Sequence, residues 1–299
     1  MKGIFFSALI RLLHVFSWLP FPLLYVFSDF LYLIIYYVLG YRKKVVIENL
    51  RNSFPEKTES ALRKIAKAYY HYLCDLLLET FKTLSFSPEE AVRRCRFKDL
   101  SLFRGLHAEG KSIIIVMGHY GNWEWAGSSM SLETDYKLFV IYHPLSNPYF
   151  DKLMYQMRTK FGTGLIAMNN TFREMVKNKS LVSATAFIAD QTPSPTKAYW
   201  TRFLNQDTPV FEGTAKIAKR MNYPVVFAHV NRIRRGYYEV HTEILVEDPR
   251  VLSEDEISER HTRRLEQEIM QKPELWLWSH RRWKHKNPGP VDVQSAAKT

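Results

Sequence analysis

A histidine and a glutamate that could act together lie five residues apart in the segment GHYGNWEW, residues 118–125. On a regular helix this separation would turn His119 and Glu124 about 140° away from each other. If His119 lies in a loop and Glu124 in the first helical turn, the carboxylate can fold back onto the imidazole. Glu124 would then keep one ring nitrogen protonated and leave the other as a proton acceptor. Gly118 and Gly121 allow the tight turns and close substrate approach that such a loop needs.

This pair is a base with its orienting group but without a nucleophile of its own. It suits deprotonation of a hydroxyl group on a substrate. The alternative is a structural histidine that caps a turn. The sequence contains no GxSxG elbow, Walker loop, GxGxxG or HExxH motif, and its other histidines show no metal-ligand spacing. Neither a metal nor another cofactor is therefore expected.

The segment before His119, KSIIIVM at residues 111–117, has the β-branched run of a buried strand. A helical pattern covers 58–81, and from residue 111 strand-like and helix-like patterns alternate. The further strands are expected at 137–142, 164–168, 181–189, 223–231 and 236–246, and the further helices at 122–133, 147–161, 170–178, 210–221 and 255–271, with a loop at 191–201. This alternation predicts an α/β fold with a mixed, largely parallel sheet flanked by helices. Sites in such folds form at the carboxyl ends of strands, where His119 lies.

The composition excludes several classes of protein. The chain has 299 residues, of which 46% are hydrophobic and 24% charged, which argues against a disordered or fibrous protein. Its mean hydropathy of −0.25 is too polar for a polytopic membrane protein. The two cysteines, Cys74 and Cys95, allow neither a disulfide framework nor a four-cysteine zinc site. The net charge of +12 indicates an anionic partner, such as nucleic acid, acidic lipid or an acidic carrier.

Much of the apolar excess lies near the N-terminus, at residues 12–39. Three interpretations stay open: a membrane span or embedded hairpin, an interfacial amphipathic helix, and a buried core helix. Basic residues follow at 42–44 and favour a main body on the cytoplasmic side. We therefore expect a membrane anchor at 1–44, one α/β domain at 45–286 and a loose polar tail at 287–299.

A second distinctive segment lies near the C-terminus, WLWSHRRWKHK at residues 276–286. Its tryptophans and basic residues suit a membrane interface. Arg281, Arg282 and Lys284 could bind lipid phosphates or an acidic carrier protein. The alternative is a solvated charged end with tryptophan packed inside. Such a composition also fits nucleic acid, but the apolar N-terminal segment favours lipid, so no nucleic-acid partner is expected.

These segments together resemble a known family. HYGNWE is similar to the HX4D/E motif of glycerolipid-type acyltransferases, and the chain over residues 1–286 resembles the late acyltransferases of lipid A biosynthesis. The further matching segments are YHPLSNP at 142–148, ADQTP at 189–193, PVFEGTAKIAK at 209–219 and PELWLWSHRRWK at 273–284. His143 departs from the pattern, because many relatives carry arginine there. A phosphate contact at this position is therefore in doubt.

The resemblance implies an enzyme of the cell inner membrane with its catalytic domain on the cytoplasmic face. It would move a fatty acyl group from acyl carrier protein, or from acyl-CoA, to a hydroxyl of a lipid A precursor. A lysophospholipid, aminolipid or glycolipid is the alternative acceptor. A non-catalytic basic membrane protein is the third hypothesis, and it predicts no acyl transfer.

The resemblance also implies roles for individual residues, with His119 as the base and Glu124 as its partner. Binding of substrate or of the oxyanion would fall to residues in the glycine loop and in three later segments: Gly121, Asn122, Arg158, Asp190, Gln191, Glu212 and Gly213. Asp190 ends a strand pattern and so is well placed for a site, although it could simply cap a loop. Glu212 is either a substrate contact or an acid of a first helical turn.

Overall fold

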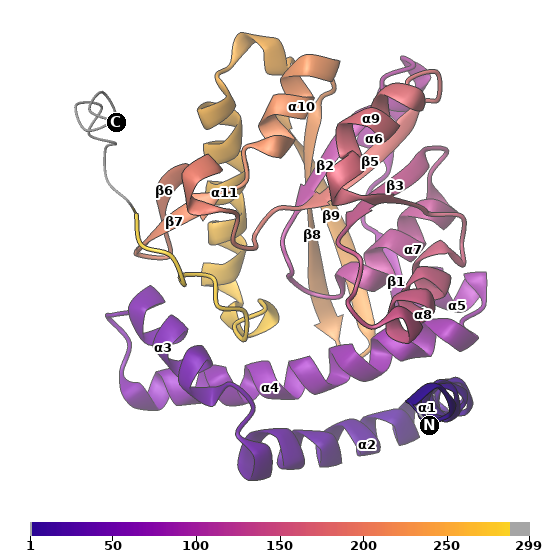
Figure 1. Cartoon of the computed structure of the whole chain (residues 1–299), viewed down its shortest axis with the longest axis vertical. Coiled ribbons are helices and arrows are strands. Elements are labelled where there is room, and N and C mark those ends of the chain that lie inside the picture. The colour runs from indigo at the N-terminus through magenta and orange to yellow at the C-terminus, as the bar shows by residue number, and fades with distance from the viewer. Residues whose placement is uncertain (1, 288–299) are drawn as a thin grey trace.

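The computed structural model describes residues 2–287. Its centre is a seven-stranded sheet in the order β1-β9-β8-β2-β5-β3-β4 (Figure 1). These strands are β1 (Cys95–Phe97), β2 (Ile113–Met117), β3 (Lys137–Tyr142), β4 (Gly164–Ala167), β5 (Ser183–Ile188), β8 (Val225–Arg234) and β9 (Tyr237–Val246). Neighbouring strands are parallel except β8 and β9, which are antiparallel. The expected α/β class with a mixed, largely parallel sheet is confirmed.

Helices cover both faces of this sheet. Their bounds are α5 (Pro88–Arg94), α6 (Ser101–Ala108), α7 (Trp123–Glu133), α8 (Pro148–Thr159), α9 (Thr171–Lys177), α10 (Gly213–Met221) and α11 (Glu254–Gln271). Side chains alternate along β2, as in any strand. Ile113 and Ile115 pack in one apolar cluster with α5, α6 and α7, whereas Ile114 and Val116 pack in another with α9, α10 and α11. The all-apolar sequence of β2 follows from this burial on both sides.

The long helix α4 (Glu59–Lys82) lies across the end of the sheet where β8 finishes (Figure 1). Thr58 caps its N-terminus, with a side chain that accepts a hydrogen bond from the backbone N–H of Ala61. Its buried face contacts the loop after β2, because the Tyr72 hydroxyl donates to the carbonyl of Gly121 at 2.5 Å. Helix α4 thus supports the loop that carries His119.

The N-terminal segment forms α1 (Lys2–Ser17), α2 (Phe21–Leu33) and a π-helical turn, η1 (Ile34–Leu39), before α3 (Lys43–Ser53). Helix α2 runs alongside α4 (Figure 1). The stretch Phe21–Leu39 is long and apolar enough to cross a membrane, yet only 22% of its most apolar window is buried. The interpretation as a buried core helix is therefore wrong.

Several elements were not expected from the sequence, among them α5, α6 and three short strands. Strand β1 has only three residues, and β6 (Tyr199–Phe203) with β7 (Gln206–Val210) forms an antiparallel hairpin at the end of the expected loop and the start of the expected helix. Elsewhere the expected strands and helices differ from the observed bounds by at most three residues at either end. The division into an anchor at 1–44 and a domain at 45–286 stays a prediction, and of the expected tail 287–299 only residue 287 lies within the described part.

Candidate active site

His119 follows β2 in a loop whose conformation depends on two glycines. Gly121 has a φ of +61°, and a Cβ atom there would collide with the carbonyl oxygen of Val230. A Cβ on Gly118 would lie 2.6 Å from a methyl group of Leu265. The loop therefore packs closely against β8 and α11, and its backbone holds His119 at the carboxyl end of β2.

The partner of His119 is Asp190, which follows β5. Nδ1 of His119 lies 2.6 Å from Oδ1 of Asp190. The other carboxylate oxygen, Oδ2, accepts hydrogen bonds from the backbone N–H of His119 and from Nε1 of Trp276, both at 2.8 Å. Strands β2 and β5 are parallel neighbours with Met117 opposite Ile188, so continuing this register by two residues brings His119 opposite Asp190.

The surroundings of Asp190 keep it ionised. Burial alone would raise the pKa of its carboxyl, but the charge of His119 and the hydrogen bonds from His119 and Trp276 lower it to about 2. An ionised Asp190 bonded to Nδ1 favours the tautomer with the proton on Nδ1. Nε2 of His119 is then unprotonated, and its lone pair can accept a proton from a substrate.

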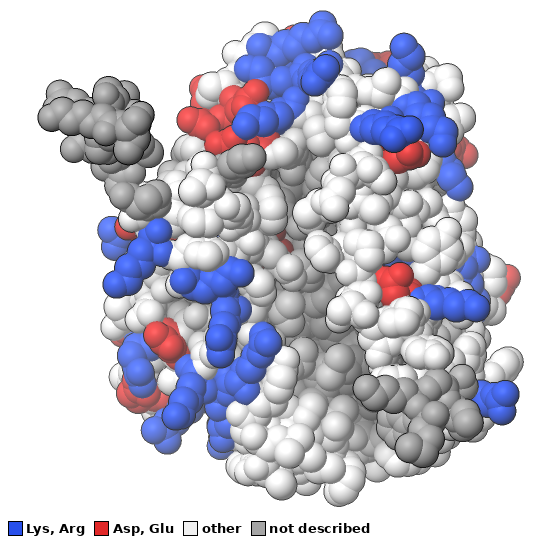
Figure 2. Space-filling model, in the orientation of Figure 1, with Lys and Arg blue, Asp and Glu red and all other residues white. Residues whose placement is uncertain are grey.

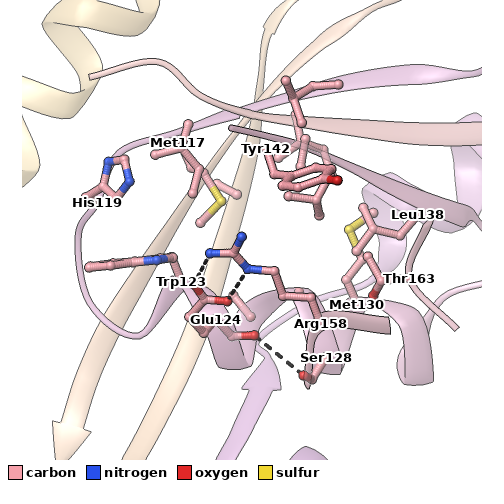
Figure 3. A pocket seen from close by; sticks show the side chains of 18 of the residues that line it. Met117, His119, Trp123, Glu124, Ser128, Met130, Leu138, Tyr142, Arg158 and Thr163 are labelled. Carbon is pink, nitrogen blue, oxygen red and sulfur yellow. Dashed lines mark hydrogen bonds and ion pairs between the residues drawn. The ribbon is translucent and has the colours of Figure 1, made fainter. Parts of the chain in front are cut away.

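Glu124 does not orient His119, and this part of the prediction is wrong. Its carboxylate forms a two-pronged ion pair with Arg158 of α8, with Nε to Oε2 at 2.9 Å and Nη2 to Oε1 at 2.5 Å (Figure 3). Glu124 lies in the first turn of α7, and there its side chain points to α8 rather than back to the loop. Burial would lower the pKa of Arg158, but Glu124 more than offsets this and raises it. The predicted pair is therefore replaced by two separate pairs, His119 with Asp190 and Glu124 with Arg158.

A cavity of about 300 Å³ opens beside His119. In the view of Figure 3, the Glu124–Arg158 pair lies between His119 and the group formed by Met130, Leu138 and Thr163. Most of the cavity lining is apolar: Phe97, Phe103, Ile115, Met117, Met130, Leu138, Val140, Ile188, Ala228 and Val240. The cavity has the size of a small-molecule pocket and an apolar interior that suits a hydrocarbon chain. Figure 2 shows that this face of the molecule is hollowed along its centre.

Comparison with known proteins identifies the family. Residues 2–285 match the family model described as bacterial lipid A biosynthesis acyltransferase. The chain belongs to this family. It is 22% identical over 251 residues to the lipid A biosynthesis palmitoleoyltransferase of Escherichia coli (strain K12), an alignment that covers 83% of this chain and 80% of the relative. A lipid A biosynthesis acyltransferase of Shigella flexneri matches with the same identity and the same coverage. The resemblance stated from the sequence is confirmed.

Two of the expected substrate-binding residues line the cavity of this acyltransferase. Gln191 lies with Nε2 3.3 Å from Nε2 of His119. Arg158 lines the same cavity, and its pair with Glu124 uses only two of its five N–H groups. Among the expected substrate-binding residues, these two side chains are the ones that could donate hydrogen bonds to a substrate in the cavity.

The glycine loop itself does not offer the expected donors. The backbone N–H of Gly121 donates to the carbonyl of Leu275 at 3.0 Å. Asn122 is fully buried, and its amide nitrogen donates to Glu79 at 2.9 Å while its oxygen caps α7. Both residues therefore hold the loop of His119 in place through hydrogen bonds within the protein. Their expected contact with substrate is therefore not available in this conformation.

Glu212 and Gly213 lie away from the cavity, at the start of α10, and neither belongs to its lining. Glu212 forms an ion pair with Lys216 one helical turn later. Glu212 is the N-cap residue that immediately precedes α10, so it lies just outside the first helical turn that the alternative interpretation named. A substrate contact at these two positions stays a prediction.

The basic C-terminal segment divides into exposed and buried residues. Arg281 and Lys284 are exposed, so their contact with a headgroup or a carrier stays a prediction. Arg282 is only 2% exposed, and a headgroup contact for this residue is therefore wrong. Trp276, whose ring donates to Asp190, was expected at a membrane interface and is instead part of the site. Its sequence neighbourhood gave no sign of this role.

Proposed function

We propose that this member of the lipid A biosynthesis acyltransferase family transfers a fatty acyl group from a thioester to a hydroxyl of a lipid A precursor, with His119 as the general base. The observation that carries the proposal is the His119–Asp190 pair at the side of an apolar cavity. A base without an adjacent nucleophile suits direct transfer between two bound substrates. The apolar cavity suits the fatty chain.

In this mechanism Nε2 of His119 removes the proton from the acceptor hydroxyl as its oxygen attacks the thioester carbonyl. A C–O bond forms and the carbonyl becomes a tetrahedral oxyanion. Arg158 and Gln191 line the cavity and are the candidates to stabilise that charge. The C–S bond then breaks, and the imidazolium returns the proton to the leaving thiolate. Asp190 stays ionised throughout and stabilises the imidazolium.

The thioester is carried by acyl carrier protein, with acyl-CoA as the alternative. An exposed basic surface is formed by the start of α3 together with the C-terminal segment. It supports the proposal of an acidic carrier or a phosphorylated acceptor. The two segments are joined by hydrogen bonds from Arg42 to the carbonyl of Ser279 and from Asn49 to the carbonyls of Trp278 and His280. Figure 2 shows Lys and Arg gathered on this side of the hollow, over α3.

The enzyme lies at the cytoplasmic face of the inner membrane, with α2 resting in the membrane surface rather than crossing it. Large apolar side chains of α2 are exposed, among them Val26 at 63% and Phe30 at 61%. The opposite side of α2 is bonded to the domain: Ser28 donates to Asp75 at 2.6 Å, and Arg235 donates to Asp29 at 2.6 Å. A span would carry this ion pair into hydrocarbon, where charges are costly, whereas an interfacial helix keeps it near water.

Mass spectrometry of lipid A tests the proposal in a strain that lacks the gene. The strain is complemented with wild type, His119→Ala or, as a matched control outside the site, His107→Ala. We expect one acyl chain to be missing and to return with wild type and His107→Ala only. Unchanged lipid A with altered phospholipids or aminolipids would favour the alternative acceptors. Full restoration by His119→Ala would contradict the mechanism.

A further inference from the structure

The residues Leu275–Trp283 form a strap that closes over the loop of His119. The backbone N–H of Leu277 donates to the carbonyl of His119 at 3.1 Å, and the carbonyl of Leu275 accepts from Gly121. Tyr120 and Trp276 pair as an isolated antiparallel bridge. Together with the indole bond from Trp276 to Asp190, these contacts connect the strap to both residues of the His119–Asp190 pair.

Arg282 lies near the end of the strap with its charge inside the protein. Its Nη2 donates to the carbonyl of Pro209 at 2.6 Å, and its own carbonyl accepts from the hydroxyl of Thr192 at 2.7 Å. Nε and Nη1 have no hydrogen-bond partner among the described residues. A buried guanidinium with two unused donors is unfavourable unless a nearby charge or ligand compensates for it.

The compensating groups lie in a small cavity behind Asp190. This cavity of about 10 Å³ is lined by Asp190, Arg282 and His261, and it has room for about one water molecule. Nε2 of His261 also has no partner among the described residues. A carboxylate has about four lone-pair sites, and Asp190 uses three of them. One water there would accept hydrogen bonds from Nε and Nη1 of Arg282. It would donate its two protons to Asp190 and to Nε2 of His261.

The charges of Arg282 and Asp190 also act on each other directly. Burial lowers the pKa of Arg282 to about 10, and the charge of Asp190 partly offsets that decrease. Arg282 is therefore cationic at neutral pH. The active site holds an anion with His119 on one side and a buried cation on the other.

We propose that Arg282 is a positioning residue, which keeps Asp190 ionised and aligned on Nδ1 of His119 through its buried charge and one bridging water. The inference rests on the proposed function, in which His119 is the base. Arg282 touches no atom of the cavity that takes the acyl chain. It therefore acts on the reaction through Asp190 and not by contact with the acyl chain.

The pH dependence of the reaction distinguishes this role from a purely structural one. The titratable groups that face Asp190 besides Arg282 are His119, His261 and His280. Burial lowers the pKa of His261 and of His280 to about 4, so neither titrates near neutral pH. Removal of the Arg282 cation makes protonation of the His119–Asp190 pair easier. The base would then be lost at higher pH, and the acid limb of the kcat profile should move upward.

The test compares Arg282→Gln, which is neutral, with Arg282→Lys, which keeps the charge. The assay uses the palmitoleoyl thioester of acyl carrier protein and lipid A precursor from the deletion strain. For Arg282→Gln we expect kcat to fall by about 100-fold with KM nearly unchanged, and the acid limb to rise by about one pH unit. Arg282→Lys should have a kcat about tenfold higher than that of Arg282→Gln, and its acid limb should stay at the wild-type pH. Arg250→Gln, an exposed arginine remote from the site, should change nothing.

Two results would overturn the inference. One is a higher KM with unchanged kcat in Arg282→Gln, which indicates a substrate contact. The other is a fall in kcat with an unmoved acid limb that lysine does not rescue, which indicates a structural role. If Arg282→Gln does not fold, Arg282→Lys decides: an acid limb displaced from the wild-type pH contradicts the proposal. His119→Ala with wild-type activity would instead refute the proposed function, so the two failures are distinguishable.

Discussion

Asp190 at the end of β5 binds Nδ1 of His119 at the end of β2, at 2.6 Å, although the two residues are 71 positions apart. The contact depends on the parallel pairing of the two strands, which brings their carboxyl ends side by side. Asp190 therefore takes the orienting role that the sequence motif suggests for Glu124.

Replacement of Asp190 by asparagine tests this assignment. We expect Asp190→Asn to lower kcat by about 10³- to 10⁴-fold, because the amide stabilises neither the required tautomer nor the imidazolium. Steady-state kinetics on the purified enzyme measure this change. A loss below tenfold would show that another group orients His119.

The ion pair between Glu124 and Arg158 should contribute mainly to structure and substrate position. Its side chains are 13% and 27% exposed, and Glu124→Gln leaves the guanidinium without its charged partner. We expect the free energy of unfolding to fall by about 2 kcal/mol. Denaturant unfolding in detergent gives this value. Glu174→Gln, which breaks the exposed pair with Lys177, is the matched control and should have almost no effect.

The volume of the cavity should determine which acyl chain is transferred. Ala228→Leu fills space in the apolar lining and should lower transfer of the native chain by about tenfold while shorter chains are still accepted. Met130→Ala enlarges the same cavity and should favour longer chains. Competition between thioesters of different length, read by mass spectrometry, measures both effects. Equal chain preference in the two variants would contradict an acyl chain in this cavity.

The exposed face of α2 should control membrane binding. Phe27→Ser with Phe30→Ser removes two large apolar side chains, each of which would contribute about 1.5–3 kcal/mol on burial, so binding to anionic vesicles should fall by at least 100-fold. Val251→Ser, an apolar residue 75% exposed elsewhere, is the control and should bind normally. Flotation with vesicles separates bound from free protein.

An interfacial α2 also predicts that both of its ends stay on one side of the bilayer. The native cysteines, Cys74 and Cys95, are buried, so a cysteine introduced at Trp18 or at Tyr41 would be the only reactive one among the described residues. Both should react with a membrane-impermeant reagent from the cytoplasmic side. Reaction of the two positions from opposite sides would establish a span instead.

The sequence predicts the local elements well because their signals are local. The buried run at 111–117 and the amphipathic pattern at 58–81 each appear in the structure as β2 and α4. The contact between His119 and Asp190 could not be read in this way, since it requires the order of strands in the sheet. The burial of Arg282 was equally hidden, because a run of basic residues is typical of a solvated surface. At the site, what the sequence missed was therefore long-range pairing.

The position of the strap has a consequence for synthesis on the ribosome. Residues 275–283 are translated after α2 and after the loop of His119, yet they supply the indole and the guanidinium beside Asp190. The nascent chain would therefore present its apolar α2 to the membrane before its catalytic centre is complete. The site would be complete only after the strap has left the ribosome, when α2 has long been available to a membrane.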